Sequence, residues 1–133
     1  MIRQILVLFD ASPISEQALL EAINIGKIYH SKVACIHPVP RHDEILIKEG
    51  QGLIKRAEEI VRSAGLEFDW RIVEDKPGPA ITKAAIRLDA DLIVLGSLGE
   101  GGIKRQLVSS TAEYVIRNAP CDVLIVKRER AVF

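Results

Sequence analysis

Glycines and hydroxyl side chains that could hold a phosphate lie close together in the last third of the chain. Gly96 and Gly99 follow a short apolar run, and Ser109, Ser110 and Thr111 stand where a helix is predicted to begin. Glycine lets the backbone approach a ligand because it carries no Cβ, and a helix start offers unpaired N–H groups and a partial positive charge. Neither of the two common phosphate-loop patterns, G-x-x-x-x-G-K-[ST] and G-x-G-x-x-G, occurs here. From spacing alone, a phosphate site and a plain loop with capping serines are equal alternatives.

One acidic and two basic residues could complete such a site. Asp10 closes the apolar run Ile5–Phe9, where its carboxylate could accept hydrogen bonds from ribose hydroxyl groups. Aspartate is also common as a turn or cap residue, and its position does not decide between the two roles. Lys104 and Arg105 lie within the glycine-rich segment and could neutralise phosphate charge.

The composition sets broad limits on the function. The 133 residues are enough for a sizeable core, and we expect a single domain over residues 1–133. The 18 basic and 18 acidic residues balance to a net charge of zero, which gives no electrostatic basis for binding nucleic acid or an anionic membrane. The first apolar run is too short for a secretory or membrane-spanning segment, so we expect a cytoplasmic protein.

The cysteines and histidines do not form a recognisable metal or redox motif. Cys35 and Cys121 lie far apart in sequence, each in or beside an apolar run, and we expect inert, buried thiols rather than a redox pair. His30, His37 and His42 are scattered without metal-ligand spacing and are interpreted as solvated or loop residues.

Strand-like apolar runs alternate with helical patterns along the whole chain. We predict strands at residues 5–9, 32–39, 67–73, 91–96 and 122–126. We predict four helices between them: one capped by Ser12 with Pro13 at its first position, one ending at Gly65, one begun by Pro79 and one from about Ser110 to Asn118. Gly50 and Gly52 fall in the first half of the second helix, and we expect that half to be irregular.

This alternation predicts an α/β fold, a doubly wound five-stranded parallel sheet with helices on both faces. Such sheets bind ligands beyond the carboxyl ends of their strands, where the strand order reverses. Asp10 ends the first strand and Gly96 ends the fourth. If those two strands are neighbours, the ligand site lies between them.

Three stretches resemble one known family. They are "ILVLFDAS" at residues 5–12, "IHPV" at 36–39 and "DLIVLGSLGEGGIKRQLVSSTAEYVIRNAPCDVLIVK" at 91–127, and they are similar to the universal stress protein family. The resemblance covers nearly the whole chain. It implies a Rossmann-like sheet of order 3-2-1-4-5.

Nucleotide-binding members of that family carry the pattern G-x2-G-x9-G-[ST] and bind ATP. In this sequence the pattern falls on Gly96, Gly99, Ser109 and Ser110. The resemblance implies ATP, possibly with Mg²⁺, as the cofactor, with the acid after the first strand at the ribose and the loop and hydroxyls at the phosphates. The site residues it implies are Asp10, Ser12, Pro38, Gly96, Gly99, Ser109, Ser110 and Thr111.

The sequence departs from the family pattern at two positions. Ser109 replaces the third glycine, which leaves its N–H available and costs about 1 kcal/mol only if the position needs a positive φ. Pro38 follows the strand-two histidine, His37, where the family pairs adenine with the backbone. Because proline has no N–H, about 1 kcal/mol of adenine binding is lost, so affinity should fall or base selectivity should blur.

Two functions follow from the resemblance. The first is an ATP-binding regulatory module of the stress response that senses ATP or hydrolyses it slowly, since no catalytic set of residues stands out. The alternative is an interaction protein of the same fold with a degenerate site, marked by Pro38 and Ser109. In either case we expect a homodimer through the apolar last strand, Asp122–Val126, with an unknown protein partner.

Two other classes fit the sequence poorly. A phosphoryl-accepting receiver domain would use strand-end residues such as Asp10, Asp75, Ser97 and Lys127, but Asp10 has no acidic neighbour and no final helix follows. A receiver also gives no reason for the glycine-rich segment. An ATP pyrophosphatase would need a glycine-rich loop after the first strand, which "DASPIS" does not offer.

Overall fold

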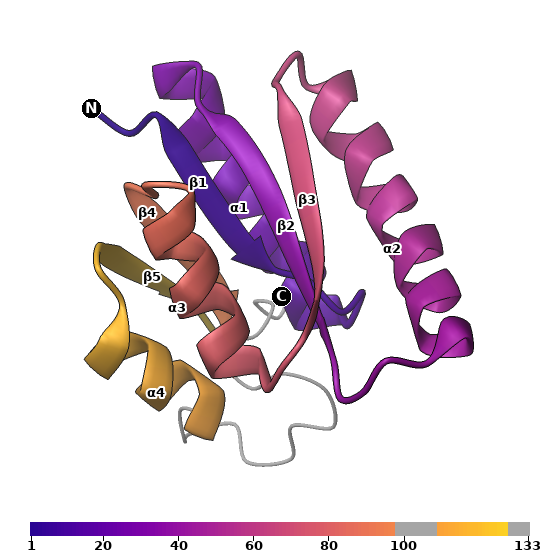
Figure 1. The fold of residues 1–133 in the computed structure, drawn as a ribbon. Coiled ribbons are helices and arrows are strands. Elements are labelled where there is room, and N and C mark those ends of the chain that lie inside the picture. Colours follow the sequence, from indigo (N-terminus) through magenta and orange to yellow (C-terminus); the bar gives the residue numbers. More distant parts are fainter. Residues whose placement is uncertain (98–108, 128–133) are drawn as a thin grey trace, which may run out of the picture.

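The computed structural model describes residues 1–97 and 109–127, in which strands and helices alternate strictly (Figure 1). The elements are β1 (Gln4–Leu8), α1 (Pro13–Tyr29), β2 (Lys32–Val39), α2 (Glu44–Ser63), β3 (Phe68–Glu74), α3 (Pro77–Arg87), β4 (Leu92–Gly96), α4 (Ser110–Asn118) and β5 (Asp122–Val126). Gly99 and the two basic residues Lys104 and Arg105 lie outside the described residues.

The five strands form one parallel sheet in the order β3-β2-β1-β4-β5. β1 lies in the middle, and Ile5 is in register with Val33 of β2 on one side and Leu92 of β4 on the other. The predicted fold class and strand order are therefore confirmed. The point where the strand order reverses falls between β1 and β4, as the placement of Asp10 and Gly96 requires.

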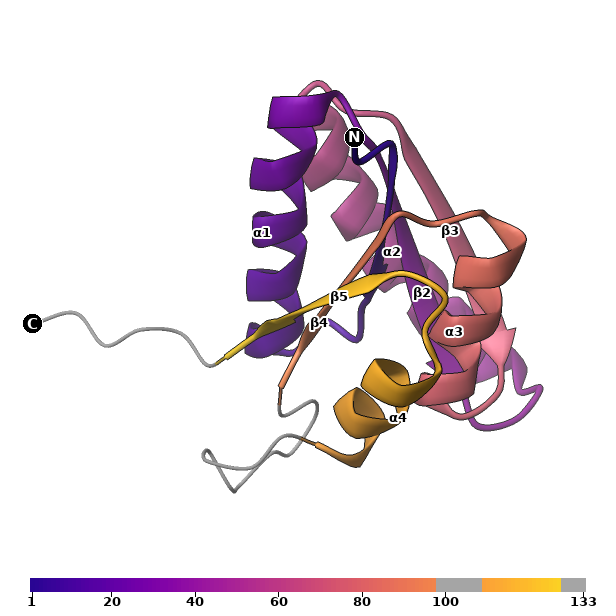
Figure 2. The ribbon, with the colours of Figure 1, turned by 90° about the vertical axis from the view of Figure 1, so that its left-hand side faces the viewer.

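Helices cover both faces of the sheet, α1 and α2 on one side and α3 and α4 on the other (Figures 1 and 2). Successive residues of β1 point to opposite faces, so Ile5 and Val7 pack under α1 and α2 while Leu6 packs under α3 and α4. All three are fully buried. This double cover explains why the central strands read as continuous apolar runs instead of alternating ones.

Local capping sets the helix starts. The Ser12 hydroxyl accepts the Ser15 N–H at the start of α1, with Pro13 at the first helical position as predicted. Asp43 caps α2 by accepting the N–H groups of Ile45 and Leu46 at 2.8 and 3.3 Å. Hydrogen bonds from the backbone of Leu46 and Ile45 hold the pKa of the Asp43 carboxyl below its usual value.

The expected irregularity in the first half of α2 is wrong, because the helix runs unbroken from Glu44 to Ser63. Gly50 is buried, and a Cβ there would lie 2.8 Å from Cδ2 of His37 and 3.3 Å from Cδ1 of Ile72. The glycine thus lets α2 approach β2 and β3 closely. Packing of the helix against the sheet outweighs the low helix propensity of two glycines.

The third helix begins at Pro77, two residues before the predicted Pro79. Both prolines fall in the first turn of α3, where a missing N–H costs no helical hydrogen bond. Either proline can therefore mark the start of the helix in the sequence. Gly78 between them has a packing role, since a Cβ would lie 2.7 Å from the Tyr114 ring of α4.

A carboxylate ties the start of β1 to the start of β4. Asp91 accepts the backbone N–H groups of Arg3 and Gln4 at 2.8 and 3.0 Å. These hydrogen bonds, that from Arg3 first, hold the pKa of Asp91 below its usual value.

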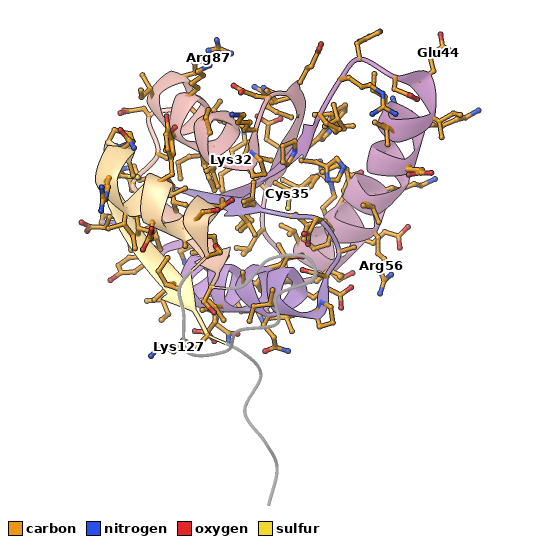
Figure 3. The ribbon with its side chains drawn as sticks, turned by 90° about the horizontal axis from the view of Figure 1, so that it is seen from below. Lys32, Cys35, Glu44, Arg56, Arg87 and Lys127 are labelled. Atoms are coloured by element: carbon orange, nitrogen blue, oxygen red, sulfur yellow. The ribbon has the colours of Figure 1, made fainter. Side chains whose placement is uncertain are left out.

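The two cysteines are free thiols, and only Cys35 is buried as expected. Cys35 lies in the core, fully buried (Figure 3), and burial raises the pKa of its thiol. Cys121 is half-buried, and burial raises the pKa of its thiol as well. Among residues 1–97 and 109–127, no helix is long and apolar enough to cross a membrane.

Candidate functional site

A cleft of about 650 Å³ lies at the carboxyl ends of β1, β2 and β4, where α1, α3 and α4 begin. Its described lining consists of Leu8, Asp10, Ser12, Ile14, Ser15, His37, Pro38, Val39, Pro40, Leu46, Glu49, Leu53, Pro77, Gly96, Ser109, Ser110 and Thr111. The cleft therefore brings together every predicted site residue except Gly99, which lies outside the described residues. Its volume falls within the range usual for small-molecule sites.

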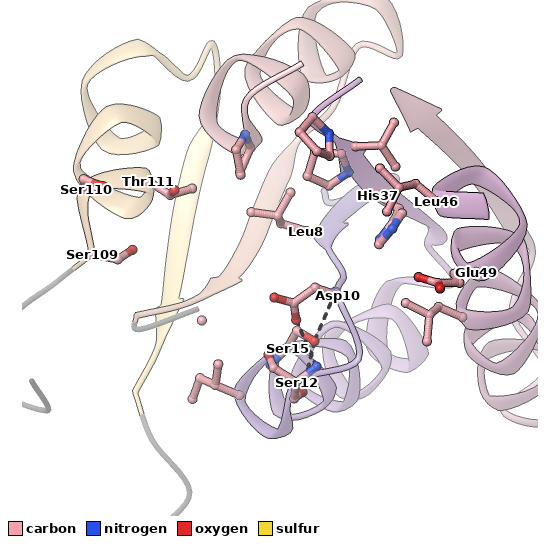
Figure 4. Close-up of a pocket in the computed structure, with 17 residues that line it drawn as sticks. Leu8, Asp10, Ser12, Ser15, His37, Leu46, Glu49, Ser109, Ser110 and Thr111 are labelled. Atoms are coloured by element: carbon pink, nitrogen blue, oxygen red, sulfur yellow. Dashed lines mark hydrogen bonds between the residues drawn. The ribbon is translucent and has the colours of Figure 1, made fainter. Parts of the chain in front are cut away.

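Asp10 is held at the floor of the cleft by a tight turn. Its Oδ1 accepts the N–H of Ser12 at 2.9 Å, and its own N–H donates to the hydroxyl of Ser15 at 3.4 Å (Figure 4). Ser15 in turn donates its hydroxyl to the carbonyl of Ser12 at 3.0 Å. Within the described residues, Oδ2 of Asp10 has no hydrogen-bond donor, so this oxygen is available to accept from a ligand hydroxyl.

The turn contains a backbone conformation that L-residues seldom adopt. Ala11, between Asp10 and Ser12, has a φ of 62°. A non-glycine residue in this region costs roughly 1–2 kcal/mol, which the surrounding hydrogen bonds must offset. The strained residue, Ala11, thus directly follows Asp10 at the end of β1.

The start of α4 forms the opposite wall. Ser109 caps the helix with a φ of −62°, and its hydroxyl accepts the N–H of Ala112 at 3.1 Å. The position does not need a positive φ, so serine fits there without backbone strain. The expectation that the Ser109 N–H stays available is wrong, because it donates to the Ser97 carbonyl at 2.7 Å.

Ser110 and Thr111 are the remaining donors of that wall. The first N–H groups of a helix have no intrahelical acceptor, so those of Ser110 and Thr111 are left for a ligand, together with both hydroxyl groups. Ser110 and Thr111, which the sequence proposed together with Ser109, thus keep free donors at this wall. The partial positive charge of the helix start acts at the same place.

Gly96 lines the cleft, but the reason for glycine there is packing. A Cβ on Gly96 would lie 2.6 Å from Cγ1 of Ile14, in the first turn of α1. The space that a side chain would need is thus filled by α1 and not by a ligand. Glycine at this position lets α1 begin directly over the end of β4.

Sequence reasoning missed the wall opposite α4. Leu46, Leu53 and Glu49 come from α2, and His37 comes from the end of β2 (Figure 4). His37 is not a solvated loop residue as expected, because it is half-buried and its Nδ1 lies 2.8 Å from the carbonyl oxygen of Phe9. That carbonyl only accepts, so Nδ1 carries the proton. No local pattern marks the α2 residues, since they reach the cleft only after α2 packs on the sheet.

The described lining is acidic. It contains the carboxylates of Asp10 and Glu49 and no lysine or arginine. A phosphate bound here would rely on the start of α4, on a cation carried with the ligand, or on residues outside the described part.

Comparisons with known proteins agree on one family. The sequence model described as "Universal stress protein family" matches residues 1–127. A universal stress protein of Methanocaldococcus jannaschii, MJ0531, is 33% identical over 96% of this chain and 84% of its own length. The structure of hypothetical protein MJ0577 superimposes with a TM-score of 0.90 at 24% identity over 98% of this chain and 99% of that one. A universal stress protein in complex with cAMP gives a TM-score of 0.79 at 26% identity over 96% of this chain and 98% of that one.

Proposed function

The chain belongs to the universal stress protein family, and on that premise we propose that it is a stress-response module that binds ATP in the cleft at the carboxyl ends of β1, β2 and β4. The observation that carries the proposal is that seven residues proposed from the sequence to contact ATP line one cleft. Support comes also from the cAMP held by a solved universal stress protein that is 26% identical to this chain.

The cleft divides into three chemically distinct parts that match the three parts of a nucleotide. The apolar side chains of Leu8, Leu46 and Leu53 suit a planar base. Asp10, with one carboxylate oxygen free of described donors, suits the ribose hydroxyl groups. The start of α4 suits the phosphates, and Mg²⁺ brought with ATP would offset the acidic lining.

Titration calorimetry of the nucleotide-stripped protein with Mg-ATP tests this function. Asp10→Ala removes the proposed ribose acceptor and should weaken binding at least about tenfold, the usual worth of a hydrogen bond to a charged group. Asp69→Ala is the matched control, because Asp69 pairs with Arg71 on β3 away from the cleft lining and should leave binding unchanged. Equal loss in both variants, or none in either, contradicts the assignment.

A second function is favoured by two observations in the cleft itself. The N–H of Ser109 is already bound to Ser97, and Pro38 has no N–H to offer. Both reduce the donors available to a nucleotide, as expected for a scaffold protein with a degenerate site. Absence of binding up to millimolar Mg-ATP would favour this alternative.

We also propose that residues 1–133 act as one cytoplasmic domain that forms a homodimer through β5. The N–H of Ser97 donates to the carbonyl of Val126, so the backbone groups of Val126 face β4 and those of Val123 and Ile125 face outward. No described strand covers this outer edge of β5. An apolar strand with such an edge can pair with a second copy of itself.

A further inference from the structure

The outer edge of β3 presents the backbone of every second residue away from the sheet. Val33 of β2 donates its N–H to the carbonyl of Glu67, just before β3 begins. Asp75, just after β3 ends, donates its N–H to the carbonyl of Val39. The odd-numbered residues of β3 therefore direct their backbone groups toward β2, and the even-numbered residues from 68 to 74 direct theirs outward. Within residues 1–97 and 109–127, no strand lies beyond this edge.

At the middle of this edge, both backbone groups of Trp70 are held by the side chains of its neighbours. The N–H of Trp70 donates to Oδ1 of Asp69 at 2.8 Å. Arg71 donates through Nη1 to the carbonyl of Trp70 at 2.7 Å and to the same Oδ1 of Asp69 at 2.8 Å. These three hydrogen bonds, which we call the Asp69–Arg71 clasp, leave Trp70 without a free backbone group for another strand.

The opposite edge of the sheet, on β5, differs in this respect. In the part of the chain that the structure describes, no side chain hydrogen-bonds to the backbone of β5. If both edges paired freely with second copies, each copy would join two others, and the assembly would grow as an open chain instead of closing as a dimer. Closure of one edge is what a protein with an open second edge needs in order to stay small.

The sequence of the β3 edge is complementary to itself in one register. If a second copy pairs antiparallel with the two Trp70 residues opposite each other, the outward backbone groups of residues 68, 70 and 72 all find partners. The same register places Asp69 of each copy opposite Arg71 of the other, on one face of the extended sheet. Pairs centred on Asp69 or on Arg71 would place like charges opposite each other, which destabilises a strand pair.

We propose that the outer edge of β3 is a self-pairing surface for a second copy of this chain, and that the Asp69–Arg71 clasp keeps this surface closed. While the clasp holds, the strand pair is interrupted at its centre, and the assembly proposed at β5 stops at the dimer. The described cleft lining contains no residue of β3, so this inference does not rest on the proposed nucleotide binding, which should persist when the edge is opened.

A double variant, Asp69→Thr/Arg71→Thr, tests the proposal by freeing both backbone groups of Trp70 with residues suited to a strand. Light scattering at matched concentrations should give the double variant a mass at least about twice that of the wild type, whether the wild type is a monomer or a β5 dimer. Trp70 is the only tryptophan of the chain and is 43% exposed, so its fluorescence reports on this edge alone. Its emission should shift to shorter wavelength as the mass rises, because pairing buries the indole.

Two controls separate pairing at β3 from other association. Adding Trp70→Pro to the double variant removes the central outward N–H, and the mass should return to that of the wild type. Glu58→Gln/Arg62→Gln removes an exposed ion pair of α2 that touches no strand, and the mass should stay unchanged.

Three results overturn the proposal: an unchanged mass in the double variant, association that survives Trp70→Pro, or a rise in mass without a shift in Trp70 emission. If circular dichroism shows that the double variant is unfolded, Asp69→Ser/Arg71→Ser frees the same backbone groups with smaller side chains and is held to the same mass and emission.

Discussion

Two glycines in α2 provide a matched test of how the helix is fixed against the sheet. Gly52 is exposed and has no atom within 4 Å of the position that a Cβ would take. Gly50, one half-turn away, is buried against His37. Alanine at either position removes the same backbone freedom from the unfolded chain, so the difference between the variants reports packing alone.

The expected magnitudes follow from those surroundings. Gly52→Ala should raise the free energy of unfolding by about 0.5–1 kcal/mol, the helix-propensity difference. Gly50→Ala gains the same amount but places a Cβ 2.8 Å from Cδ2 of His37. His37 cannot turn away without breaking its contact with the Phe9 carbonyl, and overpacking of this kind costs about 1–3 kcal/mol. Gly50→Ala should therefore be less stable than Gly52→Ala by about that cost.

Urea unfolding followed by far-UV circular dichroism measures both free energies by linear extrapolation. The slopes should be alike, because neither substitution alters how much surface unfolding exposes. An ATP titration of the two variants adds a second reading, since Glu49 and Leu53 place α2 in the cleft wall and only Gly50→Ala should weaken binding. Equal stabilisation by the two alanines would refute the claim that His37 is held between β1 and α2.

Three other perturbations test the sheet edge, an acidic contact and the thiols. Ile125→Pro removes an outward-facing N–H of β5, and light scattering should then show a monomer in place of the proposed dimer. Leu124→Pro instead breaks the hydrogen-bond ladder to β4 and should lower the thermal unfolding temperature. A dimer that survives Ile125→Pro contradicts pairing through β5. Because the fold lowers the pKa of Asp91, its ionised carboxylate contributes stability that is fully present above the pKa of the unfolded chain. This contribution is lost as the pH falls through the folded pKa, so below about pH 4 the wild type should lose more stability than Asp91→Asn. With a thiol reagent, Cys35 should react only after unfolding and Cys121 sooner, and rapid modification of Cys35 in the native protein would show that its strand opens.

Much of the architecture was predictable because it depends on short-range patterns. The strand at 32–39 and the helix at 110–118 agree with β2 and α4 residue for residue, since apolar runs and capping residues mark their ends. Ser12 and Pro13 likewise fix the start of α1. The strand order followed from the family resemblance and the rules for parallel sheets.

The errors concern residues whose role depends on distant contacts. Gly50 reads as a helix weakness until His37 lies against it, and the packing of Ile14 against Gly96 likewise has no signal in the sequence. The N–H of Ser109 donates to the carbonyl of Ser97, which lies twelve residues earlier in the chain. Such pairings are decided by tertiary packing, which spacing along the sequence does not encode.

The central position of β1 has a consequence for synthesis on the ribosome. β1 emerges first and can pair with β2 as soon as α1 and β2 follow, but its other side waits for β4 until α2, β3 and α3 have been made. During that interval the partial sheet carries an open, strongly apolar edge at Ile5, Leu6 and Val7, residues that are fully buried once the chain is complete. The nascent protein is thus most exposed to mispairing at what becomes the middle of the sheet, until β4 pairs with β1.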